Sequence, residues 1–148
     1  MADGPFPRPG PWTGRAQTAE ALVWLILARF LVGSVRFARW RSWLGSPIQT
    51  DEPTLEPGVS ERRLARAVER AAGRWPFESK CLVRAMALHW MLKRRGYDST
   101  LIIGALPETA RGTLDDLHAW IAVGKGILMG GDAQDYRILA RFRFTATT

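Results

Sequence analysis

The longest apolar stretch of the chain is Ala21–Val32, in which Arg29 is the only charged residue. It predicts a helix that begins near Thr18, because a threonine can cap a helix N-terminus and Glu20 then lies in the first turn, where the helix dipole favours an acid. The stretch is short for a membrane span, which needs about 20 apolar residues. We therefore expect a helix that packs in the core or docks a partner.

The continuation of this segment to residue 43 interleaves aromatic and basic side chains. Trp40 and Trp43 alternate with arginines, a composition typical of helices that lie on a membrane surface. Membrane association is therefore left open beside the interpretation as a core or docking helix.

Two further helices are predicted from the spacing of apolar positions. From Ser60 to about Gly73 one apolar face recurs at i, i+4 and i+7/i+8, and arginines crowd the other faces, as on a solvated surface. From about Ser79 to Arg95 the chain is apolar around much of its circumference, which is typical of a buried helix. A Lys-Arg-Arg sequence followed by Gly96 predicts where that helix ends.

Strands are predicted in the last third of the chain. Residues 99–106 are rich in β-branched and aliphatic side chains and predict a strand. Residues 118–132 predict a hairpin around the turn Gly124-Lys125-Gly126. For residues 136–144 the periodicity does not decide between a strand and a short helix.

Proline and glycine divide the chain into three parts. Residues 1–17 are rich in both and predict a flexible lead-in, and residues 45–58 contain three prolines and predict a linker. The expected organisation is therefore a lead-in over 1–17, a helix and linker over 18–58, and the main domain over 59–148.

Charge and cysteine content narrow the class of protein. The net charge is +7, and 18 of the 21 basic residues are arginines. On charge alone, nucleic acid, an acidic peptide and an anionic membrane are all possible partners. One cysteine excludes an internal disulfide and a cysteine-rich zinc site, and the first residues lack the pattern of a secretory signal. We expect a cytoplasmic protein without cofactor or metal.

The single cysteine, Cys81, lies close to the predicted start of a helix, where it is either a small core residue or a nucleophile. The chain has two histidines. His89 lies eight residues further along the same helix, about 12 Å away, which is too far to activate the thiol. His118 opens the hairpin, and folding can bring it to Cys81. A helix N-terminus and an imidazolium both stabilise a thiolate, so this pair suits a cysteine hydrolase.

A third residue should orient the imidazole. With a three-residue turn, Val123 pairs with Ile127, and Asp132 then lies opposite His118 on the same face of the hairpin. A two-residue turn would shift the register and favour Asp135 instead. We predict Asp132, with Asp135 second and Asp116 third.

Two segments together resemble a known family. They are KCLVRAMALHWMLKRRGYDSTLIIGA and LHAWIAVGKGILMGG, and the likeness extends over about residues 59–143. They resemble the transglutaminase-like cysteine proteases of lasso-peptide biosynthesis, the leader peptidases that occur either as the C-terminal half of the B protein or as a separate small chain. The matching pieces are Cys81-Leu82 with Arg84, Arg94-Arg95-Gly96, Ile102-Ile103-Gly104 and His118-Ala119-Trp120.

The resemblance implies a papain-like α+β fold in which the nucleophile helix packs on an antiparallel sheet that carries the histidine and the acid. It implies that Cys81 attacks the carbonyl at the leader–core junction, that His118 is general base and then acid, and that Asp132 orients it. Implied partners are the precursor peptide, a separate leader-recognition protein that docks on residues 18–43, and the lasso macrolactam synthetase. No nucleic acid is expected.

Two alternatives compete with leader removal. The same fold can transfer an acyl group to an amine or act as an amidase, because all these reactions pass through a thioester. The chain could instead be a non-enzymatic binding module in which Cys81 is structural, since cysteine is among the residue types most often buried.

Overall fold

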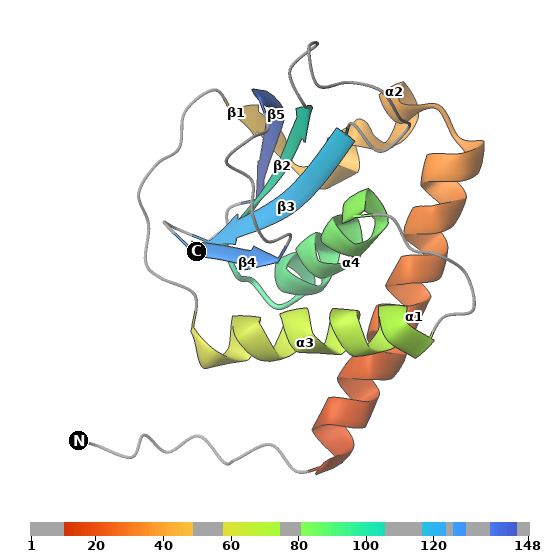
Figure 1. Ribbon diagram of the computed structural model, residues 1–148, viewed down its shortest axis with the longest axis vertical. Helices are drawn as coiled ribbons and strands as arrows, with labels where there is room; N and C mark the ends of the chain where they lie inside the picture. Colours follow the sequence, from red (N-terminus) through yellow and green to blue (C-terminus); the bar gives the residue numbers. More distant parts are fainter. Residues whose placement is uncertain are drawn as a thin grey trace.

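The computed structural model describes residues 11–48, 58–74, 81–105, 117–123, 126–129 and 137–144. In this part of the chain, helices pack on one face of a five-stranded sheet whose paired strands are all antiparallel (Figure 1). The predicted fold class is confirmed: the protein is α+β, with an N-terminal helix and a helix starting at Cys81 that packs on the sheet.

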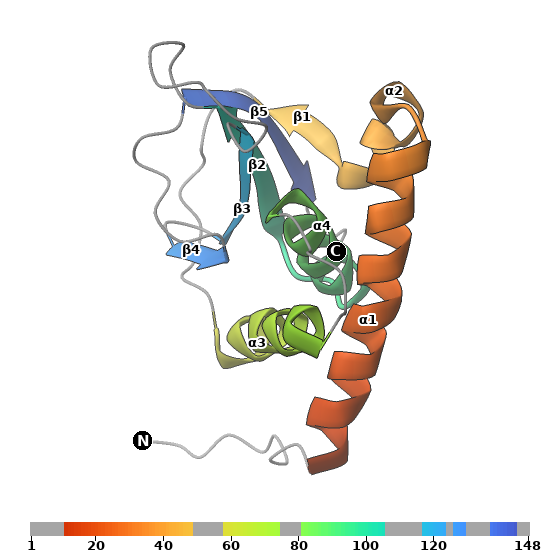
Figure 2. The same ribbon diagram turned by 45° about the vertical axis from the view of Figure 1, so that its right-hand side comes forward.

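Three long helices form the helical layer, with α4 between the sheet and the other two (Figure 2). They are α1 (Pro11–Ser34), α3 (Val59–Arg74) and α4 (Cys81–Arg94). The short helix α2 (Phe37–Trp40) and the 3-10 turn η1 (Arg41–Leu44) connect α1 to the sheet.

The helix α1 begins earlier than the sequence predicts. It starts at Pro11, and proline suits a first helical turn because its missing N–H would have no partner within the helix. The predicted cap at Thr18 is wrong: Thr18 is a buried interior residue whose Oγ1 donates to the carbonyl oxygen of Gly14 at 2.8 Å. The helix therefore takes in residues 11–17 of the expected lead-in.

One face of α1 belongs to the hydrophobic core. Its residues recur every three or four positions and pack in the same cluster as α3, α4 and the sheet; they are Ala21, Leu25, Ala28 and Leu31. By length and composition alone, Gly14–Ser34 is the one helix in the described part of the chain that could cross a membrane. The helix α1 contacts α3 and α4 and so belongs to the core. The expected boundary at residue 59 had placed this helix outside the main domain.

The side chain of Glu20 joins α1 to the end of α4. Arg95 donates to both carboxylate oxygens of Glu20, at 3.0 and 2.6 Å, and Arg94 donates to one of them at 3.1 Å. The hydrogen bonds from Arg95 are the main cause that holds the pKa of Glu20 below its usual value. The Glu20 side chain is 15% exposed and that of Arg95 31%, so this ion pair is only partly shielded from solvent.

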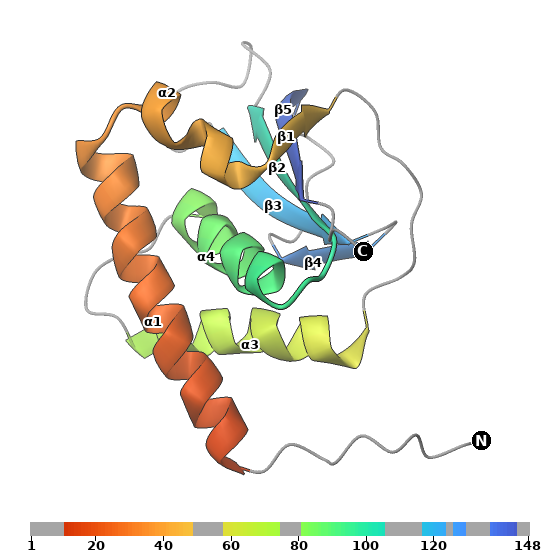
Figure 3. The same ribbon diagram turned by 180° about the vertical axis from the view of Figure 1, so that it is seen from behind.

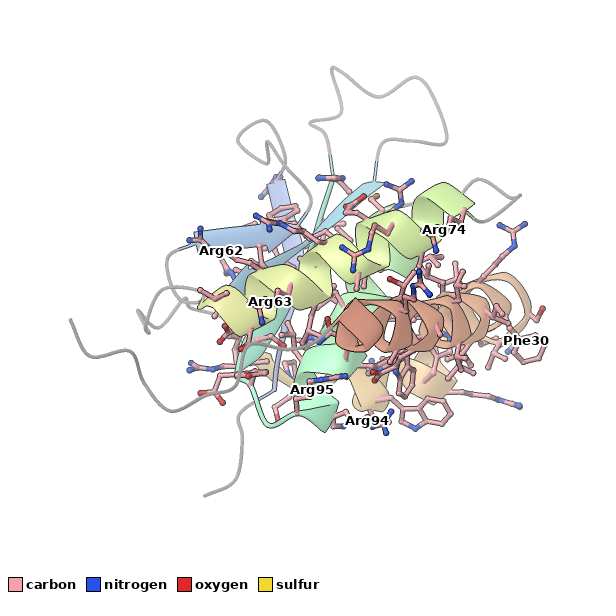
Figure 4. The ribbon with its side chains drawn as sticks, turned by 90° about the horizontal axis from the view of Figure 1, so that it is seen from below. Phe30, Arg62, Arg63, Arg74, Arg94 and Arg95 are labelled. Carbon is pink, nitrogen blue, oxygen red and sulfur yellow. The ribbon has the colours of Figure 1, made fainter. Side chains whose placement is uncertain are left out.

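The helices α3 and α4 follow the predicted patterns. The arginines of α3 are exposed, and Figure 4 shows Arg62, Arg63 and Arg74 on its outer side. The helix α4 ends at Arg94, and Gly96 follows as expected, with a φ of 77° that favours glycine. The amides of Gly96 and Tyr97 donate to the carbonyls of Lys93 and Leu92, so the last turn is closed by a Schellman motif.

The strand order in the sheet is β1-β5-β2-β3-β4. The strands are β1 (Ser46–Ile48), β2 (Ser99–Ala105), β3 (Leu117–Val123), β4 (Gly126–Met129) and β5 (Arg137–Phe144). The segment that the sequence left undecided, 136–144, is therefore a strand over its described residues. The predicted linker over 45–58 contains β1, an edge strand in which Pro47 pairs with Phe142. An edge position tolerates proline because one side of the strand makes no ladder hydrogen bonds.

Candidate active site

Cys81 is the first residue of α4 and is half-buried. The helix packs directly against β2 and β3. The N–H groups of a first helical turn are not used by the helix itself, and the N-terminus carries a partial positive charge. This position therefore suits both a thiolate and a negatively charged oxygen beside it. The preceding residues, including the expected helix start at Ser79, lie outside the described part of the chain.

His118 lies near the start of β3, directly opposite Gly104 of β2, and is half-buried. Its imidazole stacks on the indole of Trp120, with the ring centroids 5.7 Å apart and the planes 30° apart. The two residues share one face of β3 because side chains alternate along a strand. Ala119 and Ile121, on the other face, belong to the hydrophobic core.

Gly104 makes room for this aromatic pair. A Cβ atom at this position would lie 2.9 Å from Cη2 of Trp120 and 3.1 Å from the carbonyl oxygen of Arg137. A glycine within a strand pattern signals a close approach of another group, and this signal could have indicated the packing at Gly104. The absence of a side chain here allows the indole of Trp120, which is 3% exposed, to pack over Gly104 on the face that it shares with His118.

The starts of α4 and β3 lie at the same end of the molecule, and Figures 1 and 3 show this from opposite sides. The fold therefore places the backbone segments that carry Cys81 and His118 at one end of the molecule, although they are 37 residues apart in the sequence (118 − 81). The His118 side chain lies on the face of β3 that it shares with Trp120, opposite the face whose Ala119 and Ile121 pack in the core, and the thiol lies at the N-terminus of α4.

The residues predicted as the third member, Asp132, Asp135 and Asp116, all lie outside the described part of the chain. The hairpin register is described up to Met129. At the turn, Val123 pairs with Gly126, so the predicted pairing of Val123 with Ile127 is wrong. A bulge between Ile121 and Ala122 then adds one residue, and Ile121 pairs with Met129. This last pair has the register on which the choice of Asp132 depended.

His89, which its spacing from Cys81 excluded as the base, is a core residue. It is 0% exposed and hydrogen-bonds through Nε2 to the carbonyl of Leu44 at 2.5 Å and through Nδ1 to Oγ of Ser99 at 2.8 Å. A carbonyl can only accept, so Nε2 carries the proton and Nδ1 accepts from the serine hydroxyl. Burial is the main cause that lowers the pKa of His89 to about 4. The residue is therefore neutral near pH 7 and joins α4 to η1 and β2.

Other charged side chains near α4 have structural partners. Arg84, one turn after Cys81, forms an exposed ion pair with Glu69 of α3 at 3.2 Å. Within the described ranges, no cluster of three or more histidine, cysteine or acidic side chains is arranged to hold a metal ion.

Comparison with known proteins identifies a family. The model of the transglutaminase-like superfamily matches residues 23–141, which include most of α1 together with Cys81, His118 and Asp132. No curated protein and no solved structure matches the chain significantly.

Proposed function

Because this chain belongs to the transglutaminase-like superfamily, we propose that it is a cysteine endopeptidase that removes the leader from a ribosomally made lasso-peptide precursor. Its partners are the precursor peptide, a separate leader-recognition protein and the macrolactam synthetase that acts afterwards. The reaction takes place in the cytoplasm.

One observation carries the catalytic part of the proposal: the chain's only cysteine is the first residue of the helix that packs on the sheet, at the end where β3 begins. A thiol at this position is favoured as thiolate by the helix dipole. A nucleophile in the middle of α4 would instead be buried among the core side chains.

The reaction has two steps, acylation of Cys81 and hydrolysis of the resulting thioester. The Cys81 thiolate attacks the carbonyl carbon of the leader–core bond, and the Cys81 backbone N–H donates to the oxyanion. The C–N bond then breaks, the His118 imidazolium gives its proton to the leaving amine, and a thioester remains. In the second step His118 takes a proton from water and the hydroxide attacks the thioester. The C–S bond breaks, the leader is released as its acid, and Cys81 is again a thiolate beside a protonated His118.

Asp132 orients the imidazole of His118. Support comes from the hairpin, because the pairing of Ile121 with Met129 has the register that this assignment requires. The indole of Trp120 stacks on the imidazole of His118 and limits the rotation of that ring. A general base acts best when its orientation is fixed in this way.

The test is mass spectrometry of a precursor peptide from a neighbouring gene, incubated with the full chain and the recognition protein. Wild type should cut one peptide bond, and Cys81→Ala and His118→Ala should not. Asp132→Asn should lower kcat by about 10²–10⁴-fold, and Asp135→Asn serves as the matched control that keeps most of the activity. A larger loss in Asp135→Asn would reassign the acid.

Two further measurements separate this proposal from its alternatives. An added amine acceptor that becomes acylated in place of water would identify an acyltransferase. The rate of alkylation by iodoacetamide at pH 7 is compared with that of Cys81→Ala/Ser42→Cys, whose only thiol is at an exposed position of η1. A Cys81 that reacts more slowly than this control, in a protein that cuts nothing, would make the thiol structural and end the proposal.

A further inference from the structure

The helix α1 has a second apolar face, which points to solvent. Val23, Ile26, Leu27 and Phe30 are 63%, 48%, 37% and 58% exposed. They follow one another at i, i+3, i+4 and i+7, so they form one continuous line along the helix. We call these four residues the apolar stripe. Figure 4 shows Phe30 projecting outward from α1, away from the body of the protein.

The apolar stripe is bordered by a hollow on each side. Ile26 and Phe30 line a hollow of about 560 Å³ together with Arg29. Leu27 lines a second hollow of about 420 Å³, together with Trp43, Lys93 and Arg94 among others. Trp43 is itself 51% exposed. The stripe therefore continues sideways into an exposed tryptophan, and basic residues border it on both sides.

The segment that carries the apolar stripe has basic residues and no acidic ones. Residues 21–50 contain no aspartate and no glutamate, whereas the whole chain has 14 acidic residues. The same 30 residues contain Arg29, Arg36, Arg39 and Arg41, and all four are exposed. Glu20 precedes this segment, and Arg94 and Arg95 pair with it. The apolar stripe therefore lies in a segment whose charges are all basic, with Arg29 and Lys93 in the hollows beside it.

We propose that the apolar stripe and Trp43 bind the surface of an anionic lipid bilayer, with α1 lying in the plane of the interface. Aliphatic and aromatic side chains enter the acyl boundary, tryptophan prefers the headgroup level, and arginines pair with anionic headgroups. The complementary charge and the absence of any acid over residues 21–50 favour this occupant over a protein surface, which would need matched acidic and apolar groups.

The core contacts of α1 decide how the helix lies. Ala21, Leu25, Ala28 and Leu31 face α3 and α4, so the helix cannot cross a bilayer while the protein keeps this fold. Only the opposite face can enter lipid, to the depth of its side chains. The binding does not depend on the proposed peptidase activity.

The test is co-sedimentation of the full chain with vesicles of phosphatidylglycerol and phosphatidylcholine, beside vesicles of phosphatidylcholine alone. Wild type should bind the anionic vesicles, and added salt should weaken the binding because it screens the arginines. The double variant Ile26→Ser/Phe30→Ser should lower the partition coefficient by at least about tenfold, since both side chains lose their apolar area. Far-UV circular dichroism checks that it folds, as expected for two exposed positions.

The matched control is Val59→Ser/Leu139→Ser, which removes two apolar side chains that are 68% and 57% exposed but lie on α3 and β5. It should bind like wild type. Equal losses in both double variants would mean that any exposed apolar residue contributes, and the proposal would fail. It would also fail if soluble wild type did not bind anionic vesicles, in which case the apolar stripe would be left for a protein partner such as the recognition protein.

Discussion

Acidification from pH 7.5 to 5.0 should destabilise this protein through His89. Burial, the largest cause, lowers the pKa of His89 to about 4; the proximity of Lys93 adds to the effect and the hydrogen bond to Leu44 opposes it. In an unfolded chain the pKa of histidine is about 6.5. Below pH 6.5 the unfolded state therefore binds a proton that the folded state refuses. The stability that this difference provides is complete above pH 6.5 and is lost between pH 6.5 and pH 4.

The size of the effect follows from the two pKa values of His89. A pKa lowered from 6.5 to about 4 corresponds to about 3 kcal/mol once the transition is complete, at about 1.4 kcal/mol per pH unit. At pH 5.0, where carboxylates with ordinary pKa values are still mostly ionised, the linkage relation gives a loss of about 2 kcal/mol. A typical domain is stabilised by roughly 5–15 kcal/mol, so this loss is a substantial part of the total.

The assay is urea unfolding followed by tryptophan fluorescence at pH 7.5 and 5.0. His89→Gln keeps an N–H for the Leu44 carbonyl and an oxygen for the Ser99 hydroxyl but does not titrate, so its free energy of unfolding should change by less than about 0.5 kcal/mol between the two pH values. His118→Gln is the matched control, and its free energy of unfolding should fall by the same amount as expected for wild type, about 2 kcal/mol.

The reasoning is refuted if wild type and His89→Gln lose the same free energy of unfolding on acidification. Histidine side-chain NMR of the wild type provides an independent measurement that does not depend on the variant. The imidazole resonances of His89 should stay those of a neutral ring, protonated at Nε2, down to about pH 5. Titration near pH 6.5 would contradict the burial argument directly.

Two further predictions concern packing and ion pairs. Gly104→Ala should displace the indole of Trp120, because a Cβ there would lie 2.9 Å from that ring. It should destabilise the fold by about 1–3 kcal/mol and lower kcat. The matched control is Gly73→Ala, where nothing lies within 4 Å, and thermal unfolding should show it to be neutral or stabilising. Glu20→Gln should cost about 1–2 kcal/mol because it breaks a bidentate pair that is partly shielded from solvent. Glu69→Gln, whose side chain is 51% exposed, should cost less than about 1 kcal/mol. Equal costs in urea unfolding would show that shielding of the Glu20 pair has no effect.

Local patterns predicted much of this fold from the sequence. The helix α4 is apolar around most of its circumference and ends close to Gly96, and β2 is a run of β-branched and aliphatic residues, so each element is specified by neighbours a few residues away. The single cysteine close to the start of a helix and the histidine that opens a strand could be recognised in the same way, and with them the family.

Features that depend on distant residues could not be predicted. The β1 strand exists because Ser46–Ile48 pairs with β5, almost 100 residues further on, and three prolines nearby suggested a linker instead. The turn has a different register from the predicted one, and the bulge at Ile121 and Ala122 restores the predicted register at Met129. No local pattern in the sequence indicated either feature. The place of Trp120 beside His118 depended on Gly104, the residue opposite His118 in another strand, which leaves room for the indole.

The two histidines show which properties the sequence determines and which depend on the tertiary structure. The sequence alone excluded His89 as a base, because helix geometry fixes its distance from Cys81. Only the tertiary structure made His89 a neutral link between η1, α4 and β2, since its pKa and its tautomer are set by burial and by Leu44, 45 residues away in the sequence. Residue types and short spacings determine which groups are available for chemistry, whereas the environment that sets their protonation and orientation comes from residues that only folding brings together.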